Sequence, residues 1–525
     1  MPGVPPSHPA TRSPALLVLG LLLSLVPVAA AQAPTFAEGP CPFVLAPEDQ
    51  DEVRCGRVAV PLDRADPAAG TVELQLAIVA STSPDPGAPI LYLEGGPGGS
   101  AVATVPFWWT TSRLREHADV IVVDQRGSGF STPSLDCWEA YVATASDPEG
   151  ACRARLAREG VPLQAFGSDD AAADVVAVMD ALRLPRVSLV GSSYGTRLAL
   201  TALRDHPERF RALVLDGVYP PHVRHLERQA ELGWSALNTL FDACRADAAC
   251  DAAYPRLERT LIAAMVRRTA APLRIPAGPL DGATLYLTLV DLLRGGDAAA
   301  YLPALIDAAY RGDARRWTAL ETAYAGGAYD PEAYLDEIEA LLAWLVGRPM
   351  GPALDAHLAS LPAGERATLR ARAEGLYDLD AEAVYYAVEC AEEVPFARGD
   401  VAARRIARLP APLSFLLDDV RWMQAACSTW RVPVATPRQR TPVSGPVPTL
   451  LLSGAFDPIT PPVLAEEAAA QLERAYALVV PGVGHGTLDV DPCATAIALA
   501  FLDDPSRPPD TACLADRPAP AFVLP

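Results

Sequence analysis

One short segment constrains the fold of this chain more than any other. Residues 187–206 have the pattern of an apolar strand, a tight turn and a helix, and the turn carries G-x-S-x-G at Gly191–Gly195. Such a turn lifts the side chain of its central residue, Ser193, out of the top of a sheet, where a substrate can reach it. Glycine is needed at the outer positions because strand and helix backbones leave no room for a Cβ atom. We therefore expect a helix-covered sheet with a nucleophilic serine at one edge.

Strands and helices alternate along much of the chain. This alternation predicts an α/β fold, in which a mostly parallel, twisted sheet has helices on both faces. The first two strands alternate apolar and polar residues, as a half-buried antiparallel hairpin does. We expect strands at 53–61, 71–80, 89–94, 119–124, 187–191, 212–216, 448–454 and 475–481, and helices at 169–182 and 194–206.

The alternation stops between about Val218 and Pro446. This stretch is rich in Ala, Leu and Arg, has helical spacing, as in 257–268 and 332–345, and shows almost no strand signal. We interpret it as a helical lid inserted between two neighbouring core strands, because an insertion at the carboxyl edge of a sheet covers the site there. The predicted core then has a first part, 32–217, and a second part, 447–525, with the lid at 218–446.

The N-terminus has the pattern of an export signal. Arg12 precedes an apolar run at 15–30, and small residues at 29–31 suit cleavage. The run is short for a bilayer span, which needs ~20 apolar residues, and Pro27 interrupts it. We expect residues 1–31 to be a cleaved signal peptide. The mature protein would be secreted or periplasmic, with no stable membrane insertion.

Charge and cysteine content narrow the class further. The 525 residues are 50% hydrophobic and carry a net charge of −21, which argues against nucleic acid as a partner. An even number of cysteines in an exported protein indicates disulfides, whose connectivity the sequence leaves open, although sequence neighbours form five natural pairs. There is no C-x-x-C motif, and we expect no metal, no cofactor and a monomer. The cysteines are Cys41, Cys55, Cys137, Cys152, Cys244, Cys250, Cys390, Cys427, Cys493 and Cys513.

A serine nucleophile needs a base and an acid. Of the seven histidines, only His485 lies on the loop after the last expected strand, where an elbow of this kind places its base. Asp457 follows the strand before it and is positioned to accept the other ring N–H. Asp489 and Asp491 are rivals, but they follow the histidine and would reverse the order of serine, acid and histidine. We predict a triad of Ser193, Asp457 and His485.

The turn after the third expected strand is rich in glycine. An oxyanion hole needs two backbone N–H groups aimed at the developing negative oxygen. We expect one from Tyr194, directly after the nucleophile, and the other from Gly95 or Gly96 in the turn at 94–99. A phosphate-binding loop is the competing interpretation. The turn lacks the P-loop lysine and fits only the loose G-x-G-x-x-A dinucleotide pattern, which is weak by itself.

Taken together, these motifs resemble the α/β-hydrolase peptidases of the prolyl iminopeptidase and tripeptidyl aminopeptidase group. The resemblance covers nearly all of the mature chain, and it implies an α/β-hydrolase fold and a serine peptidase. One departure is Glu94, where the group's H-G-G-P-G motif begins with His. The matching segments are Gly95–Gly98, Asp124–Gly129 (D-Q-R-G-x-G), Gly191–Gly195 (G-x-S-Y-G), Asp457–Pro461 (D-x-x-T-P), Gly484–Gly486, the lid start at Phe241–Pro255 and the stretch from Cys427 onward.

The resemblance also implies an ammonium site. Aminopeptidases of this group bind the free α-amino group of the substrate with acidic side chains from the lid, because a buried ammonium needs a paired carboxylate. The candidates are Glu389, Glu392 and Glu393 around Cys390, and the group's pattern favours Glu392, with Glu393 beside it. Glu94 is a weaker candidate. Alternatively, these glutamates form only a solvated helix face.

These observations favour a secreted serine exopeptidase of the tripeptidyl or prolyl aminopeptidase type. It would cleave N-terminal residues from small peptides through an acyl-enzyme on Ser193. A carboxylesterase or amide hydrolase on small esters is the alternative, and it would need no ammonium site. A non-catalytic binding protein on the same fold is disfavoured by the complete set of Ser193, Asp457 and His485.

Overall fold

The computed structural model describes residues 34–525 except 44, 138–146, 329–380, 516 and 518–519. The predicted signal peptide at 1–31 and the helix expected at 332–345 lie outside the described residues. No helix in the described part of the chain is both long enough and apolar enough to cross a bilayer.

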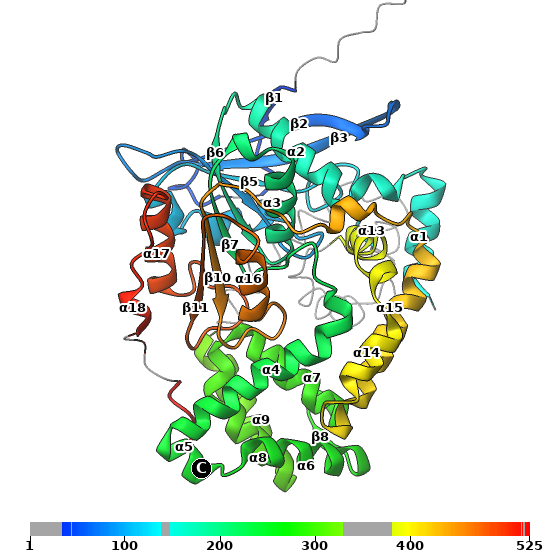
Figure 1. Ribbon diagram of the computed structural model, residues 1–525, viewed down its shortest axis with the longest axis vertical. Helices are drawn as coiled ribbons and strands as arrows, with labels where there is room; N and C mark the ends of the chain where they lie inside the picture. The colour runs from blue at the N-terminus through cyan, green and yellow to red at the C-terminus, as the bar shows by residue number, and fades with distance from the viewer. Residues whose placement is uncertain (1–33, 44, 138–146, 329–380, 516, 518–519) are drawn as a thin grey trace, which may run out of the picture. The chain divides into compact units, whose positions relative to one another are not determined.

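A single nine-stranded sheet carries the fold, in the order β1-β2-β3-β5-β4-β6-β7-β10-β11 (Figure 1). The pairs from β1 to β5 are antiparallel, and the pairs from β5 through β4 to β11 are parallel. The α/β prediction is confirmed, and the short edge strand β1 was not expected. The strands are β1 (Phe36–Gly39), β2 (Val53–Asp63), β3 (Asp66–Val79), β4 (Ile90–Leu93), β5 (Val120–Val123), β6 (Val187–Ser192), β7 (Phe210–Asp216), β10 (Thr449–Gly454) and β11 (Ala475–Val480).

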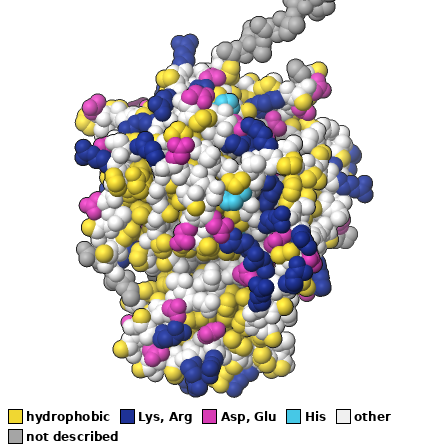
Figure 2. Space-filling view, in the orientation of Figure 1, with side chains coloured by type: hydrophobic (Ala, Val, Ile, Leu, Met, Phe, Trp, Pro, Cys, Tyr) yellow, Lys and Arg dark blue, Asp and Glu magenta, His cyan; other side chains and the backbone are white. Residues whose placement is uncertain are grey.

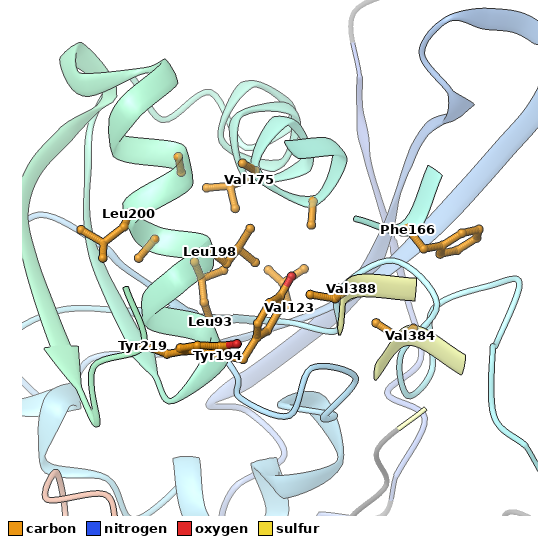
Figure 3. Close-up of a cluster of buried hydrophobic side chains, with 14 of the residues drawn as sticks. Leu93, Val123, Phe166, Val175, Tyr194, Leu198, Leu200, Tyr219, Val384 and Val388 are labelled. Atoms are coloured by element: carbon orange, nitrogen blue, oxygen red, sulfur yellow. The ribbon is translucent and has the colours of Figure 1, made fainter. Parts of the chain in front are cut away.

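Alternate residues of each central strand pack on opposite faces of the sheet. In β5, Ile121 and Val123 belong to one buried cluster, whereas Val120 and Val122 belong to the other. The first cluster includes α2 (Ser168–Ala181) and α3 (Tyr194–Asp205), and the second includes α17 (Pro492–Asp503). Figure 3 shows the first cluster, with Val123 close to Leu198 of α3. Burial on both faces explains why these strands read as continuous apolar runs.

The helical block enters between two adjacent strands of the sheet. β7 and β10 pair in parallel, with Leu213 opposite Thr449, although more than two hundred residues separate them in the sequence. A two-stranded sheet of β8 (Leu273–Ile275) and β9 (Gly278–Leu280) within this stretch was not expected. The described helices of the block are α4 (His225–Ala246), α5 (Ala248–Ala253), α6 (Leu257–Ala270), α7 (Gly282–Gly295), α8 (Leu302–Arg311), α9 (Ala314–Ala328), α13 (Glu382–Glu392), α14 (Gly399–Ile406) and α15 (Leu416–Trp430).

Part of this block shares a core with the sheet, whereas α4 to α9 contribute to a separate buried cluster. Val384 and Val388 of α13 lie in the same buried cluster as Leu93 and Val123 (Figure 3). Residues 34–525 accordingly form one unit by their contacts. The lid boundaries at 218 and 446 stay a prediction.

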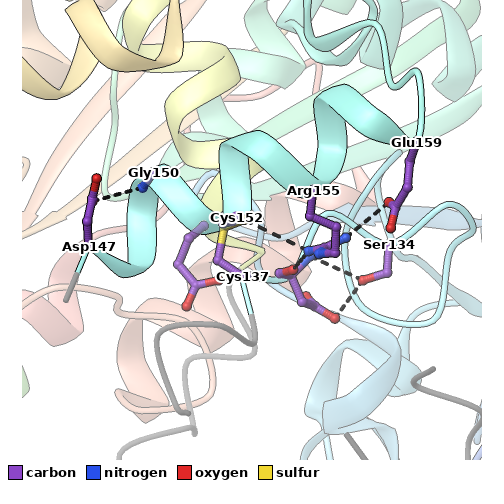
Figure 4. Close-up of a disulfide and its surroundings, with 9 residues drawn as sticks. Ser134, Cys137, Asp147, Gly150, Cys152, Arg155 and Glu159 are labelled. Carbon is purple, nitrogen blue, oxygen red and sulfur yellow. Dashed lines mark hydrogen bonds and ion pairs between the residues drawn. A yellow bond between two sulfur atoms is a disulfide. The ribbon is translucent and has the colours of Figure 1, made fainter. Parts of the chain in front are cut away.

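Five disulfides join the cysteines, each to its neighbour in the sequence. One of them ties Cys137 to Cys152 of α1 (Pro148–Arg158), where Asp147 caps the helix by accepting a hydrogen bond from Gly150 N (Figure 4). Disulfides are typical of proteins in oxidising compartments. The pairs are Cys41–Cys55, Cys137–Cys152, Cys244–Cys250, Cys390–Cys427 and Cys493–Cys513.

Charged side chains of both signs are interspersed over the face shown in Figure 2. Several of them form exposed ion pairs, such as those from Asp400 to Arg398 and Arg404 around α14. Exposed pairs of this kind contribute little to stability, typically below ~1 kcal/mol each.

Candidate active site

Ser193 occupies a strained turn between β6 and α3. Its φ is 52° and its ψ is −120°, a conformation that non-glycine residues rarely adopt. Its N–H donates a hydrogen bond to the backbone oxygen of Asp216, at 2.9 Å. A Cβ atom on Gly195 would lie 2.0 Å from the oxygen of Leu93, and one on Gly191 would lie 2.5 Å from the oxygen of Gly195. The close approach that requires glycine on both sides of the serine is therefore present.

Asp457 and His485 are hydrogen-bonded to each other. The distance from His485 Nδ1 to Asp457 Oδ2 is 2.8 Å. The Thr460 hydroxyl donates to the same carboxylate oxygen at 2.7 Å, and the N–H groups of Ile459 and Thr460 donate to Oδ1 at 2.8 Å. Because Nδ1 is engaged by the carboxylate, Nε2 is the ring nitrogen left to accept a proton.

The two partners shift each other's pKa. Burial alone would raise the pKa of Asp457, but the charge and hydrogen bond of His485 and the Thr460 donors bring it below its usual value. Burial likewise opposes protonation of His485, yet the Asp457 carboxylate outweighs it and raises the pKa of the imidazole. The pair thus favours an ionised carboxylate that stabilises an imidazolium.

The end of β7 holds both the serine and the histidine loop. Besides the backbone bond to Ser193, Asp216 accepts hydrogen bonds through its carboxylate from Thr487 N, Thr487 Oγ1 and Leu488 N, at 2.6–2.9 Å. A Cβ atom on Gly217 would lie 3.0 Å from His485 Cε1. The imidazole therefore lies beside the strand end that binds the serine backbone.

No hydrogen bond joins the Ser193 hydroxyl to the His485 ring among the described residues, so the complete triad stays a prediction. Asp216 was not singled out from the sequence. The available signal was its position, because it ends the strand next to the nucleophile strand.

The glycine turn after β4 lies against the serine. A Cβ atom on Gly95 would lie 2.9 Å from Ser193 Cβ, and Gly96 lines the same cavity as Ser193. Gly95 N donates to Glu94 Oε1 at 2.8 Å, while Glu94 Oε2 accepts from the Tyr92 hydroxyl at 3.3 Å. Since the Gly95 N–H is engaged by Glu94, Gly96 and Tyr194 are the better candidates for the oxyanion hole. Glu94 shapes the turn and does not line the cavity.

A cavity of about 330 Å³ opens beside Ser193. Two acids line it, Glu389 of α13 and Asp419 of α15. The described residues contain no group of three His, Cys, Asp or Glu side chains that could hold a metal ion. The other lining residues are Gly96, Tyr219, His225, Leu226, Gln229, Tyr385, Val394, Trp422, Met423, Ile459 and Thr460.

The three candidate glutamates of α13 and its end have different environments. Glu389 lines the cavity, accepts a 3.4 Å hydrogen bond from the Tyr219 hydroxyl and forms no ion pair within the described chain. Burial, reinforced by the charge of Glu393, raises its pKa to about 8.

Glu392 and Glu393 are each 1% exposed and do not line the cavity. Glu393 accepts hydrogen bonds from Leu226 N and Arg440, at 3.1 and 2.8 Å, and Glu392 bonds Ser168 and Arg197. The structure thus brings Glu389 to the cavity, whereas the sequence pattern favoured Glu392 and Glu393.

Comparisons with known proteins agree with this geometry. Residues 88–246 match the family model of the alpha/beta hydrolase fold, and residues 414–513 match that of TAP-like protein. The serine protease Hip1 of Mycobacterium tuberculosis is 25% identical over 495 residues, which cover 87% of this chain and 86% of that protein. The tripeptidyl aminopeptidase of Streptomyces coelicolor is 27% identical over 81% of this chain and 75% of its own length. Carboxylesterase B of Mycobacterium tuberculosis is 31% identical over 46% of this chain and 54% of its own length.

The fold, the strained serine turn and these matches define the chain as a serine hydrolase of the α/β-hydrolase superfamily. Within that superfamily, the match of residues 414–513 to the TAP-like model and the relatives that align with most of the chain support a TAP-like serine peptidase. The resemblance inferred from the sequence motifs is confirmed.

Proposed function

We propose that this protein is an exopeptidase that removes short N-terminal peptides, or a single residue, from small peptides. Two relatives that align with most of the chain are a serine protease and a tripeptidyl aminopeptidase. The lid proposed at 218–446 would limit access to short substrates.

The proposed chemistry is acyl transfer from the peptide to water. His485 takes the proton of the Ser193 hydroxyl as that oxygen attacks the scissile carbonyl, and Asp457 stabilises the imidazolium that forms. The N–H groups of Gly96 and Tyr194 would bind the negative oxygen of the tetrahedral intermediate. His485 then gives the proton to the leaving amine, and water hydrolyses the acyl-enzyme by the same steps.

The single observation that carries an exopeptidase is the position of Glu389. This buried carboxylate faces the cavity that Ser193 lines and has no cationic partner among the described side chains within ion-pair distance. A buried carboxylate without such a partner is costly, and a substrate ammonium would complete it with a charge-assisted hydrogen bond. An esterase acting on a neutral ester has no use for this group.

The test compares three substrates: a tripeptidyl arylamide with a free amine, its N-acetyl form and a p-nitrophenyl ester. We expect N-acetylation to lower kcat/KM on the order of 100-fold, because the acetylated substrate has no ammonium to form a charge-assisted hydrogen bond with Glu389. Glu389→Gln should remove most of this difference and leave ester hydrolysis unchanged. Glu208→Gln, on a surface turn, is the matched control. Equal turnover of free and N-acetylated arylamides by the unaltered enzyme would contradict the exopeptidase.

A carboxylesterase is the second candidate, because carboxylesterase B is similar over part of the chain. The same panel decides between the two functions. An esterase hydrolyses the p-nitrophenyl ester well, both arylamides poorly, and does not respond to Glu389→Gln.

We also propose that the protein is exported and that residues 1–31 are removed. The five disulfides support an oxidising compartment. N-terminal sequencing of the exported protein should begin at Gln32. An N-terminus at Met1 on exported protein would contradict cleavage.

We propose that the protein is a monomer. Chromatography with light scattering should show a single species with the mass of one chain.

A further inference from the structure

A chain of hydrogen bonds runs from the inserted helices to the residue after the nucleophile. Glu392, the last residue of α13, accepts from Ser168 N through Oε1 at 2.7 Å and from the Ser168 hydroxyl through Oε2 at 2.8 Å. The Ser168 oxygen lies 2.9 Å from the Tyr194 hydroxyl. A serine hydroxyl has one proton to give. Since Ser168 donates it to Glu392, Tyr194 donates to Ser168.

Every side chain in this series of hydrogen bonds is buried. Glu392 and Tyr194 are 1% exposed and Ser168 is 2% exposed. Ser168 is the first residue of α2, so the Glu392 carboxylate lies at the positive end of that helix. A Cβ atom on Gly167 would come within 3.2 Å of Glu392 Oε1, so the approach is close.

The nucleophile helix has a second contact with the same carboxylate. Arg197 of α3 donates from Nε to Glu392 Oε2 at 3.2 Å. Its Nη1 and Nη2 atoms have no hydrogen-bond partner within the described residues, and its guanidinium lies 4.8 Å from the centre of the Tyr219 ring. Glu392 is therefore the hydrogen-bonded anchor of a buried guanidinium. The Cys390–Cys427 disulfide fastens this end of α13 to α15.

We propose that Glu392 is a positioning residue which, through Ser168, fixes Tyr194 and so the backbone N–H that Tyr194 supplies to the oxyanion hole. Tyr194 is the first residue of α3, where backbone N–H groups have no partner within the helix. Tyr194 directly follows the strained Ser193, and the hydrogen bond of its hydroxyl to Ser168 holds the outer end of its side chain in place. An oxyanion donor must be in place before charge develops, and a displacement of ~1 Å can cost up to ~100-fold in rate.

This inference rests on the proposed catalysis by Ser193 but not on the exopeptidase specificity. The assay is therefore hydrolysis of the p-nitrophenyl ester. The test variants are Tyr194→Phe and Ser168→Ala. Both break the hydrogen bonding between Glu392 and Tyr194 while leaving Glu392 paired with Arg197. Tyr254→Phe is the matched control, since it deletes a hydroxyl of the helical block that donates to Val523 O, near the C-terminus, at 2.7 Å.

We expect both test variants to lower kcat about tenfold, a fraction of the loss for a missing oxyanion donor, with KM within about twofold. Their affinity for a boronic acid, which forms a tetrahedral adduct on Ser193, should fall by the same factor. Inhibition by a product acid should stay unchanged. Tyr254→Phe should match the unaltered enzyme in all three measurements.

A purely structural role predicts something different. If the melting temperature falls while kcat and boronate affinity match the control, or if only KM rises, the inference is overturned. Glu392→Gln should reproduce the losses in kcat and boronate affinity where it folds, and Tyr194→Phe decides the question by itself where it does not. Full ester turnover by Ser193→Ala would refute the catalysis. Failure of the arylamide selectivity alone would refute the exopeptidase and leave this test intact.

Discussion

Two buried carboxylates beside this cavity have opposite environments. Asp457, on a loop of the sheet core, accepts hydrogen bonds from Ile459, Thr460 and His485, and its pKa is lowered. Glu389, on a helix of the inserted block, accepts one long hydrogen bond from Tyr219, and its pKa is raised to about 8. The core pairs its carboxylate with groups of its own. The side of the cavity formed by α13 and α15, here called the inserted wall, instead leaves the Glu389 carboxyl group for a ligand cation to pair.

The local backbone explains the difference. Asp457 begins a turn, so the N–H groups that follow it are free to fold back onto its side chain. Glu389 lies inside α13, where the neighbouring N–H groups are used within the helix. Its partners have to come from other elements, and only Tyr219 reaches it with a hydrogen bond among the described residues.

The largest expected effect concerns the core side of this comparison. Ser193→Ala removes the nucleophile, and kcat should fall by several orders of magnitude, on the order of 10⁴–10⁶. The melting temperature should not fall, because Ala and Ser tolerate the strained turn about equally well. In addition, the substitution leaves no buried hydrogen-bonding group without its partner. Kinetics on the ester and a thermal melt check both statements. Labelling of this variant by a fluorophosphonate would assign the nucleophile elsewhere.

Asp457→Asn should come next, with a loss in kcat of about 10⁴-fold, because the amide favours the wrong tautomer of His485. The pH profile sharpens the assignment. In the unaltered enzyme kcat/KM should fall with decreasing pH as His485 becomes protonated, with a midpoint above its usual 6.5. The variant should shift this midpoint downward, since the raising charge is gone. An unchanged midpoint would mean that another group sets the profile.

The sequence was sufficient for the core side. The fold follows from strand–helix alternation, and the serine turn and the Asp457 loop are encoded in consecutive residues whose backbone conformations are local. The short strands β1, β8 and β9 were missed because segments of 3–4 residues carry little periodic signal. Asp216 was missed because the residues that donate hydrogen bonds to its carboxylate, Thr487 and Leu488, are distant in sequence.

The inserted wall shows where sequence reasoning ends. Glu389, Glu392 and Glu393 are spaced as i, i+3 and i+4, so all three lie toward one side of a helix. Their separate roles depend on what approaches each of them. Arg197 and Ser168 donate hydrogen bonds to Glu392, and Arg440 donates one to Glu393. Glu389 instead lines the cavity. No local pattern contains these long-range contacts.

The pH dependence of KM is a more moderate test of the same wall. Because burial raises the pKa of Glu389 to about 8, we expect this group to be mostly protonated in the free enzyme below that pH, so that binding an ammonium releases a proton. KM for the free-amine arylamide should therefore rise as pH falls from 8 to 6, up to about tenfold per unit. Above pH 8 the substrate amine itself loses charge, so the lowest KM is expected near pH 8. Calorimetry in buffers of different ionisation enthalpy should detect the proton release.

Two controls bracket this prediction. The p-nitrophenyl ester and the Glu389→Gln variant should both give a KM that varies little between pH 6 and 8. A KM for the free-amine substrate that stays flat over this range would separate Glu389 from amine binding, whatever the effect of its substitution.

The smallest effect on turnover is expected from removing disulfides. Disulfides fasten the inserted wall, whereas hydrogen bonds hold the Asp457 loop. Cys390–Cys427 closes 37 residues and Cys244–Cys250 closes 6. Since loop closure restricts the unfolded chain, replacing the first pair by serine should cost about 4 kcal/mol of unfolding free energy and the second about 2 kcal/mol. Ester kcat should change little in either variant. Denaturant unfolding measures the order of the two losses, and a larger loss for the short loop would show that native contacts, rather than loop length, set the contribution of each disulfide.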